Sequence, residues 1–299
     1  MGQEIGLDAK TGRKFYLDDP DDLKPGEPVT FILNLHGGGS VGAWQQKYFP
    51  AVDYKNKYRL VVATPSAATK EPSRRWVGEA DDEHLHNIVN QVFDKYGVQN
   101  IRAFWLAGHS QGGMTSSRLL AEDPFFQDRV DGRLSLSGGR IGPAERSANA
   151  GPPSTPGQPR NTMMRPAAYP PPPCDLSFIF TTGEHEIAAL PESSPWAEKY
   201  GAGPRERRPD IVDTEPGQIY DTSREAYSTK EWGLKPAPGT AQEWVYPGAR
   251  DGRVIADIVR LNKGHTEGLE PKVTEEIIRL MVSAPGGKAQ KLARASAPA

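Results

Sequence analysis

Ser110 lies at the centre of Gly108-His109-Ser110-Gln111-Gly112, which reads G-x-S-x-G. An apolar run precedes this pattern and a helical pattern follows it, so the serine is predicted at a sharp turn from a strand into a helix. The flanking glycines leave room for neighbouring backbone, and the N-terminus of the helix favours an oxyanion beside the hydroxyl. We therefore expect Ser110 to be a catalytic nucleophile.

A second glycine motif, His36-Gly37-Gly38-Gly39, follows an earlier apolar run. Backbone N–H groups in such a motif can approach a substrate oxygen closely, because glycine has no Cβ. We expect the N–H groups of Gly38 and Gln111 to form an oxyanion hole, with Gly37 and Gly39 as alternative donors.

A general base must take the proton of the serine, and six histidines compete for this role. His265 is the preferred base because it follows the last apolar run, where the chain order serine, acid, histidine requires it. The others are interpreted as glycine-motif residues, as helix residues and as a neighbour of the acid (His36 and His109, His84 and His86, and His185, respectively).

An acidic residue completes a triad of serine, histidine and acid. It orients the imidazole and stabilises its charged form. It is expected in the loop after the fifth apolar run, where Glu186 lies three residues beyond Gly183. Glu186 is the preferred acid and Glu184 is the near alternative. Asp251 and Asp257 are more distant alternatives.

Aromatic residues near the glycine motif and the first helix are expected to line a substrate pocket. Trp44 and Trp76, together with His36, form this predicted wall. No histidine or acidic cluster has the spacing of a metal site, since His84 and His86 are two residues apart and do not share a helix face. We expect no metal and no cofactor.

Short apolar runs that end at glycine, proline or polar residues predict the strands that position these side chains. They span residues 29–35, 60–64, 101–107, 133–137, 176–181 and 254–261. Apolar residues at helical spacing occupy 85–96, 114–121 and 273–281. The almost continuous apolar character of the runs predicts an α/β fold with a mostly parallel sheet flanked by helices. Ligands of such sheets bind beyond the carboxyl ends of the strands, where the motifs lie.

The chain of 299 residues is expected to form a single domain over 1–283. A Pro-rich insertion is predicted at 142–173, and a cap over the site or a long excursion at 187–245. The small, polar and basic residues at 284–299 predict a flexible tail.

The net charge of −2 lacks the basic excess that nucleic-acid binding requires, and no apolar run is long enough to span a membrane. Neither partner is expected. The single cysteine, Cys174, excludes an internal disulfide, and the N-terminal residues do not resemble a signal peptide. A cytoplasmic location is expected, or secretion if a leader has been removed.

Taken together, these motifs resemble the α/β-hydrolase serine esterases, and among them the polyhydroxybutyrate depolymerase and feruloyl-esterase-like group. Three further stretches carry the closer match: a W…DD segment, an acid loop, and a last strand with a G-H motif (Trp76 with Asp81-Asp82, Phe178 to Glu186, and Tyr246 to His265). Glu186 departs from the aspartate that is usual in the acid loop.

The resemblance implies an α/β-hydrolase fold and hydrolysis of a small or oligomeric carboxylic ester through an acyl-enzyme, with aryl, feruloyl or hydroxyalkanoate esters as candidates. A peptidase or amide hydrolase on the same fold is one alternative, since a triad alone does not choose the leaving group. A catalytically silent binding protein of this fold is another. The natural ester and the oligomeric state are left open.

Overall fold

The computed structural model of the protein describes residues 4–70, 73–139, 171–186, 190, 192–218, 230–233 and 236–295. Its central strands run parallel: β3 (Val29–Leu35), β4 (Leu60–Pro65), β5 (Ile101–His109), β6 (Gly132–Leu136), β7 (Ser177–Gly183) and β11 (Ile255–Arg260). Antiparallel strands extend both edges: β1 (Glu4–Asp8), β2 (Arg13–Asp18), β8 (Glu206–Arg207), β9 (Ile211–Val212) and β10 (Thr240–Val245).

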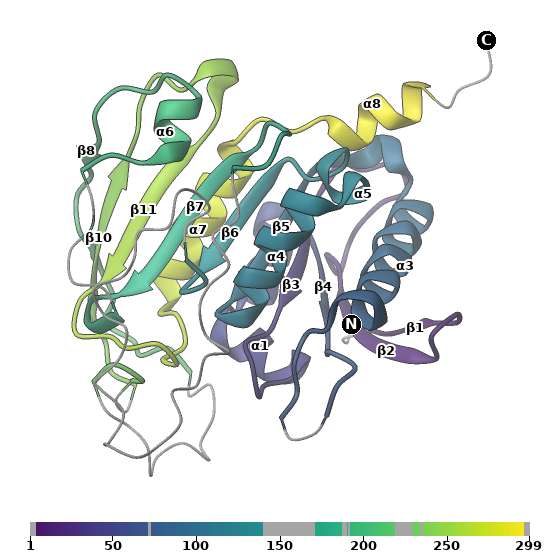
Figure 1. Ribbon diagram of the computed structural model, residues 1–299, viewed down its shortest axis with the longest axis horizontal. Coiled ribbons are helices and arrows are strands. Elements are labelled where there is room, and N and C mark those ends of the chain that lie inside the picture. The colour runs from purple at the N-terminus through teal and green to yellow at the C-terminus, as the bar shows by residue number, and fades with distance from the viewer. Residues whose placement is uncertain are drawn as a thin grey trace.

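These strands form one sheet in the order β1-β2-β4-β3-β5-β6-β7-β11-β10-β8, with β9 also paired to β10 (Figure 1). Every residue of β3, β4 and β7 is buried. Burial on both faces explains their almost continuous apolar sequences, because a parallel sheet is covered by helices on each side. The predicted mostly parallel sheet and the positions of its six predicted strands are confirmed, with ends that differ by one or two residues.

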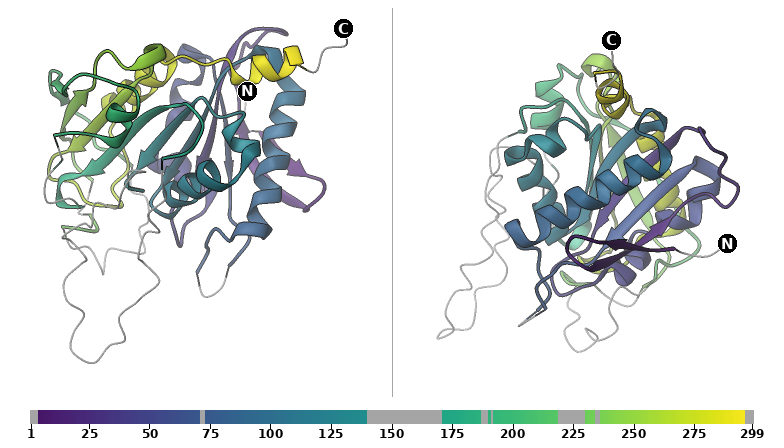
Figure 2. Two further views of the ribbon diagram at one scale, coloured as in Figure 1. Left: turned by 45° about the horizontal axis from the view of Figure 1, so that its top comes forward. Right: turned by 90° about the vertical axis from the view of Figure 1, so that its right-hand side faces the viewer.

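Helices cover both faces of the sheet (Figures 1 and 2). One face carries α3 (Gly78–Tyr96), α4 (Gln111–Glu122), α5 (Pro124–Gln127) and α6 (Pro195–Lys199), and the other carries α1 (Gly42–Tyr48) and α7 (Pro271–Ser283). Shorter turns are α2 (Lys55–Tyr58), η1 (Ala51–Tyr54), η2 (Val98–Asn100), η4 (Glu184–Glu186) and η6 (Arg250–Gly252).

Strand β3 shows how one strand serves both layers. Successive side chains of a strand point to opposite faces. Phe31 and Leu33 therefore join the core beneath α3 and α4, whereas Ile32 joins the core beneath α7. All three are fully buried, and burial of each such side chain contributes about 1.5–3 kcal/mol to stability.

The C-terminal residues correct one expectation. Instead of a flexible tail after Ser283, Lys288–Ala295 form helix α8, which packs against the start of β5. Gly287 N donates to Arg102 O at 3.0 Å, Lys288 N donates to Asp131 Oδ1 at 3.1 Å, and Ala289 is fully buried. These are tertiary contacts, which the polar composition of the segment does not indicate.

The two interruptions predicted in the chain fare differently. The Pro-rich prediction at 142–173 lies outside the described residues except for 171–173. The described parts of 187–245 contribute α6 and three short strands, so they extend the sheet at the β11 edge. Trp196 of α6 stacks on Phe178 of β7 with ring centroids 4.9 Å apart. Over the described ranges, no helix has the length and apolar character needed to cross a membrane.

Candidate active site

Ser110 occupies a strained turn between β5 and α4. Its backbone has φ 49° and ψ −115°, a conformation that non-glycine residues rarely adopt. The turn is held by Ser110 N, which donates to Leu136 O at 2.9 Å, and by Ser110 O, which accepts from Met114 N at 3.0 Å. Strain of this kind costs about 1–3 kcal/mol and is concentrated at functional sites.

The two outer glycines of the serine motif are required by close backbone contacts. A Cβ on Gly108 would lie 2.3 Å from Gly112 C, and a Cβ on Gly112 would lie 2.4 Å from Leu35 O. Both distances are too short for any side chain. The turn is thus pressed against its own helix and against the end of β3, which brings the serine beside the glycine motif.

His265 and Glu186 meet at the same edge of the sheet. His265 Nδ1 hydrogen-bonds Glu186 Oε2. The other carboxylate oxygen, Oε1, accepts from Ser137 Oγ at 2.8 Å and from Gly183 N at 2.9 Å. Burial raises the pKa of Glu186, but His265 and these donors outweigh that effect, so its pKa lies below the usual value. The carboxylate is therefore ionised at neutral pH, as an acid that stabilises an imidazolium must be.

The other candidate acids lie elsewhere. Glu184 Oε2 accepts from the backbone N–H of Asn262 at 2.8 Å. Asp257 accepts from Tyr246 Oη at 2.9 Å inside the sheet. Asp251 is in the exposed turn η6. The structure therefore brings Glu186, and none of these alternatives, to the imidazole of His265.

His265 contacts the serine turn at His109. The Nε2 of His109, the residue before Ser110, lies 2.9 Å from His265 O, and the two rings are 4.9 Å apart. The order β5-β6-β7-β11 aligns the ends of the strands that carry serine, acid and histidine. Within the described part of the chain, Ser110 Oγ has no hydrogen-bond partner. Hydrogen bonds between catalytic groups are often long in the absence of substrate and tighten when the substrate binds.

The glycine loop, residues 36–40, lies against the start of α4. A Cβ on Gly38 would be 3.5 Å from Gln111 Oε1, so the two predicted oxyanion donors belong to adjacent segments. Gln111 is the first residue of α4, where backbone N–H groups have no partner within the helix. Gly39 N donates to Arg74 O at 2.7 Å, which removes Gly39 from the alternatives and leaves Gly37 open.

The prediction that His36 lines a substrate pocket is wrong, because its side chain is completely buried. Its Nδ1 donates to Gly37 O at 2.7 Å, and its Nε2 accepts from Ala67 N at 3.0 Å. Burial lowers the pKa of His36 to about 4, so the ring is neutral. Trp76 Nε1 donates to His36 O at 2.7 Å. Trp76 is only 7% exposed, and both rings support the loop from behind.

Two tryptophans remain exposed near the site. Trp44 of α1 is 37% exposed and lies one turn before Tyr48, whose ring is 3.9 Å from that of His109. Trp232 is 44% exposed and meets the His265 ring edge to face, with centroids 5.3 Å apart. Sequence reasoning missed Trp232. It was visible only as one of several aromatics among prolines and charges.

The paired aspartates at the start of α3 fasten the segment behind the glycine loop. Asp81 accepts from Val77 N at 2.7 Å and Ala68 N at 2.9 Å, and pairs with Arg13 at 2.7 Å. Asp82 pairs with Arg118 of α4 at 2.6 Å. The W…DD segment of the sequence therefore has a structural role in this chain.

The helix histidines have acidic partners, as expected for packed positions. His84 Nδ1 lies 2.8 Å from Asp8 Oδ2, and His86 Nε2 lies 2.6 Å from Asp123 Oδ2. Among the described residues, no group of three histidine, cysteine or acidic side chains could hold a metal ion.

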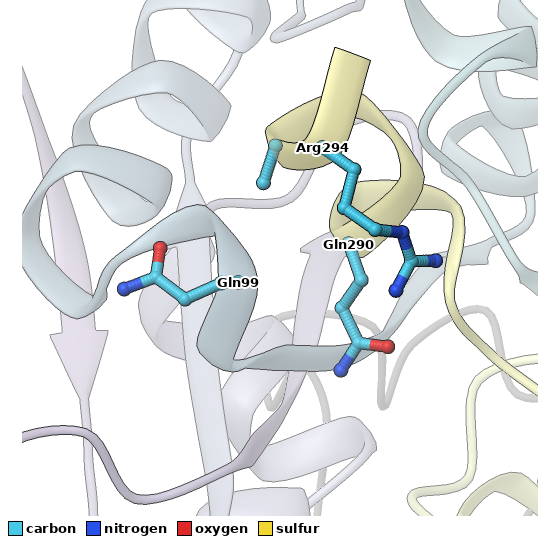
Figure 3. Close-up of a pocket in the computed structure, with 4 residues that line it drawn as sticks. Gln99, Gln290 and Arg294 are labelled. Carbon is cyan, nitrogen blue, oxygen red and sulfur yellow. The ribbon is translucent and has the colours of Figure 1, made fainter. Parts of the chain in front are cut away.

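A hollow elsewhere on the molecule has no part in this chemistry. It lies between η2 and α8 and is lined by Gln99, Gln290, Ala293 and Arg294 (Figure 3). Its position near the start of β5 is at the opposite edge of the sheet from Ser110. The candidate site is therefore the carboxyl edge and not this hollow.

Comparisons with known proteins bear on the fold. No protein-family model and no curated protein matches the chain. Among solved structures, the chain is similar to an acetyl xylan esterase from Aspergillus awamori, with 13% identity, a TM-score of 0.53, and coverage of 94% of this chain and 100% of that one. It also matches TT1662 from Thermus thermophilus (17% identity, 94% and 97% coverage, TM-score 0.46) and an esterase from Thermogutta terrifontis (15%, 61% and 72%, 0.40).

The likeness to the Aspergillus awamori structure and the order of the strands together define the fold class. The chain has the α/β-hydrolase fold, as its motifs implied. At this level of identity the likeness concerns architecture alone. The narrower resemblance to the depolymerase and feruloyl-esterase-like group stays a prediction.

Proposed function

We propose that the chain is a serine hydrolase that cleaves carboxylic esters through an acyl-enzyme. The observation that carries the proposal is the contact of His265 Nδ1 with the partly buried carboxylate of Glu186, beside the strained turn of Ser110. A histidine held by an ionised acid at one nitrogen keeps its other nitrogen available for a proton. An unstrained serine turn, or a histidine without this partner, would not support the proposal.

In the first half of the reaction, His265 Nε2 takes the proton of Ser110 Oγ as that oxygen attacks the ester carbonyl. The carbonyl oxygen becomes an oxyanion, which the N–H groups of Gly38 and Gln111 stabilise. His265 then protonates the departing alcohol, and the acyl group remains on Ser110. Glu186 stabilises the imidazolium during both transfers.

In the second half, water takes the place of the alcohol. His265 removes a proton from this water, which attacks the acyl carbonyl and forms a second oxyanion, stabilised by the same two N–H groups. Collapse of this intermediate releases the carboxylic acid and returns the proton to Ser110. No step needs a cofactor.

The substrate class follows less directly. Exposed Trp232 offers apolar surface beside the ring of His265, which suits an ester with an apolar or ring-containing part. The Aspergillus awamori neighbour is described as an acetyl xylan esterase, so acetyl esters are the first compounds to test, followed by feruloyl and 3-hydroxybutyrate esters.

The test is hydrolysis of p-nitrophenyl acetate and butyrate by wild type, Ser110→Ala and His265→Ala. We expect both substitutions to lower kcat by about 10⁴-fold or more. A fluorophosphonate probe should label wild type and not Ser110→Ala. Retained turnover in Ser110→Ala would rule out the serine mechanism. Matched ester and anilide substrates compare esterase with amidase activity, and a wild type that neither turns over nor labels would indicate a silent binding protein.

A further inference from the structure

A buried cluster of charges lies directly behind the loop that carries His265. We call residues 263–270 the base loop. The cluster, named the base-loop cluster, consists of Arg260, Lys263, Glu267 and Glu270, each at most 3% exposed. Two positive and two negative charges balance, so the cluster is neutral as a whole.

Arg260 connects the end of β11 to the far end of the base loop. Its Nε lies 2.8 Å from Glu270 Oε2, and its Nη2 lies 3.1 Å from Oε1 of the same carboxylate. The guanidinium also donates to Glu267 O at 2.8 Å and Gly268 O at 2.7 Å. The last residue of β11 is thereby joined to the residue before α7, and the intervening backbone carbonyls are held as well.

Glu267 holds the backbone directly before His265. Its Oε2 accepts from Gly264 N at 2.6 Å, and Gly264 directly precedes His265. Lys263 Nζ lies 3.9 Å from Glu267 Oε1 and 3.1 Å from Glu270 Oε1, which links both carboxylates. A residue outside the base loop also holds it, because His265 N donates to Glu231 O at 2.9 Å. The backbone around the imidazole is thus held from both sides.

Stability alone does not account for such a cluster. Removing four charges from water is costly, and apolar residues of similar volume are often as stable or more so. What a fully paired polar network provides is one geometry. A general base needs this, because catalytic groups must be held within about 0.5 Å of the productive position.

We propose that Glu267 is a positioning residue for His265: its carboxylate fixes the Lys263–Gly264 peptide, one residue before His265, and so directs the imidazole toward Glu186 and Ser110. The kinetic consequence rests on the proposed function, but the placement of the imidazole does not. Because the effect runs through one accepted hydrogen bond, it depends on where the carbonyl-type oxygen of residue 267 lies and not on its charge.

Two substitutions separate these properties. Glu267→Asp keeps the charge next to Lys263 but withdraws the carboxylate from Gly264 N by one methylene. Glu267→Gln keeps an acceptor oxygen in place and removes the charge. We expect Glu267→Asp to lower kcat roughly 10- to 100-fold with KM unchanged, and Glu267→Gln to retain more of the activity. Equal losses, or the reverse order, would overturn the proposal.

A measurement independent of turnover is the downfield proton resonance of His265 Nδ1–H, assigned by its absence in His265→Ala. It should shift or broaden in Glu267→Asp and persist in Glu267→Gln. An unchanged resonance in Glu267→Asp would overturn the proposal whatever the activity. If wild type neither hydrolyses esters nor labels at Ser110, the proposed function fails, while the resonance still decides the role of Glu267.

The matched control is Asp8→Asn. Asp8 is a buried carboxylate with hydrogen bonds from Thr11, His84 and Asn87, on the edge strand β1. Its loss should lower thermal stability without altering kcat or the resonance. If Glu267→Asp behaves in the same way as this control, Glu267 has a structural role only.

Discussion

The two loops that flank Ser110 are held in place by different chemistry. The glycine loop depends on uncharged groups: the neutral ring of His36, the indole of Trp76 and backbone amides. The base loop depends on buried ions, with Glu270 at its end paired to Arg260 of β11. In the proposed mechanism both loops must be rigid, but one presents N–H groups to an oxyanion and the other holds an imidazole whose charge changes.

The difference corresponds to these roles. Oxyanion donors are fixed dipoles that act through their preorganised position, so uncharged groups are sufficient to support them. In the proposed mechanism the base gains and loses a proton in each half-reaction, and an ionised acid next to it stabilises the charged state. A lower pH therefore affects the supports of the two loops in opposite ways. Protonation would remove the charge that Glu186 must keep, whereas it would add a charge to His36, which must stay neutral.

The largest effect should come from substitution of Glu186, the acid in contact with His265. Glu186→Gln keeps the shape but removes the charge that stabilises the imidazolium, and it places an amide against His265 Nδ1. We expect kcat/KM to fall by about 10³- to 10⁴-fold, measured on p-nitrophenyl acetate. Glu184→Gln is the control and should stay near wild type, since Glu184 binds the backbone of Asn262. Comparable losses in both variants would contradict the assignment.

The next effect concerns the neutral histidine on the oxyanion side. The pKa of His36 is lowered from 6.5 to about 4 by burial. Between these pH values the unfolded chain binds a proton that the folded chain does not, so the free energy of unfolding falls as the pH drops. The whole contribution is of the order of 3 kcal/mol.

Denaturant unfolding at pH 7 and pH 4.5 measures this contribution. His36→Gln removes the titrating ring, so the stability of this variant should fall less between the two pH values than that of wild type. The comparison uses differences within each protein, because the substitution also changes stability at pH 7. An equal fall in both proteins would show that His36 does not titrate in this way.

A smaller effect should follow loss of the indole N–H behind the glycine loop. Trp76→Phe leaves His36 O without its donor, which costs about 1–3 kcal/mol of stability when the acceptor is buried. Because the oxyanion donors would then be held less firmly, we expect kcat to fall by roughly tenfold with little change in its pH dependence. An altered pH profile would link Trp76 to the base instead.

Much of the fold could be predicted because buried parallel strands are apolar along their whole length. The edge strands were missed because they lack a continuous apolar run: β1 is short and mostly exposed, and β10 is only partly buried. Helix α8 could not be recognised either, since its position depends on contacts with Arg102 and Asp131, far away in the chain.

The site shows the same division. The turn at Ser110 could be singled out because a local motif specifies a strained turn from a strand into a helix. His265 and Glu186 could be proposed from their order along the chain, and the structure places them in contact. The burial of His36 could not be predicted, because it depends on contacts with Ala67 and Trp76, which lie 31 and 40 residues away in the chain. Neither could the base-loop cluster, since its meaning lies in which charges become buried together.

The smallest effect should arise at Trp232, which touches the base loop without belonging to its ionic support. Its backbone O accepts from Thr266 N at 2.9 Å, and this bond survives in Trp232→Ala. Only the indole next to His265 is lost, so the imidazole should keep its position and its resonance. We expect kcat/KM to fall about threefold on esters of bulky alcohols, since the proposed mechanism has His265 protonate the departing alcohol, and less on methyl esters. Equal losses on both kinds of ester would mean that Trp232 supports the base and does not contact the alcohol.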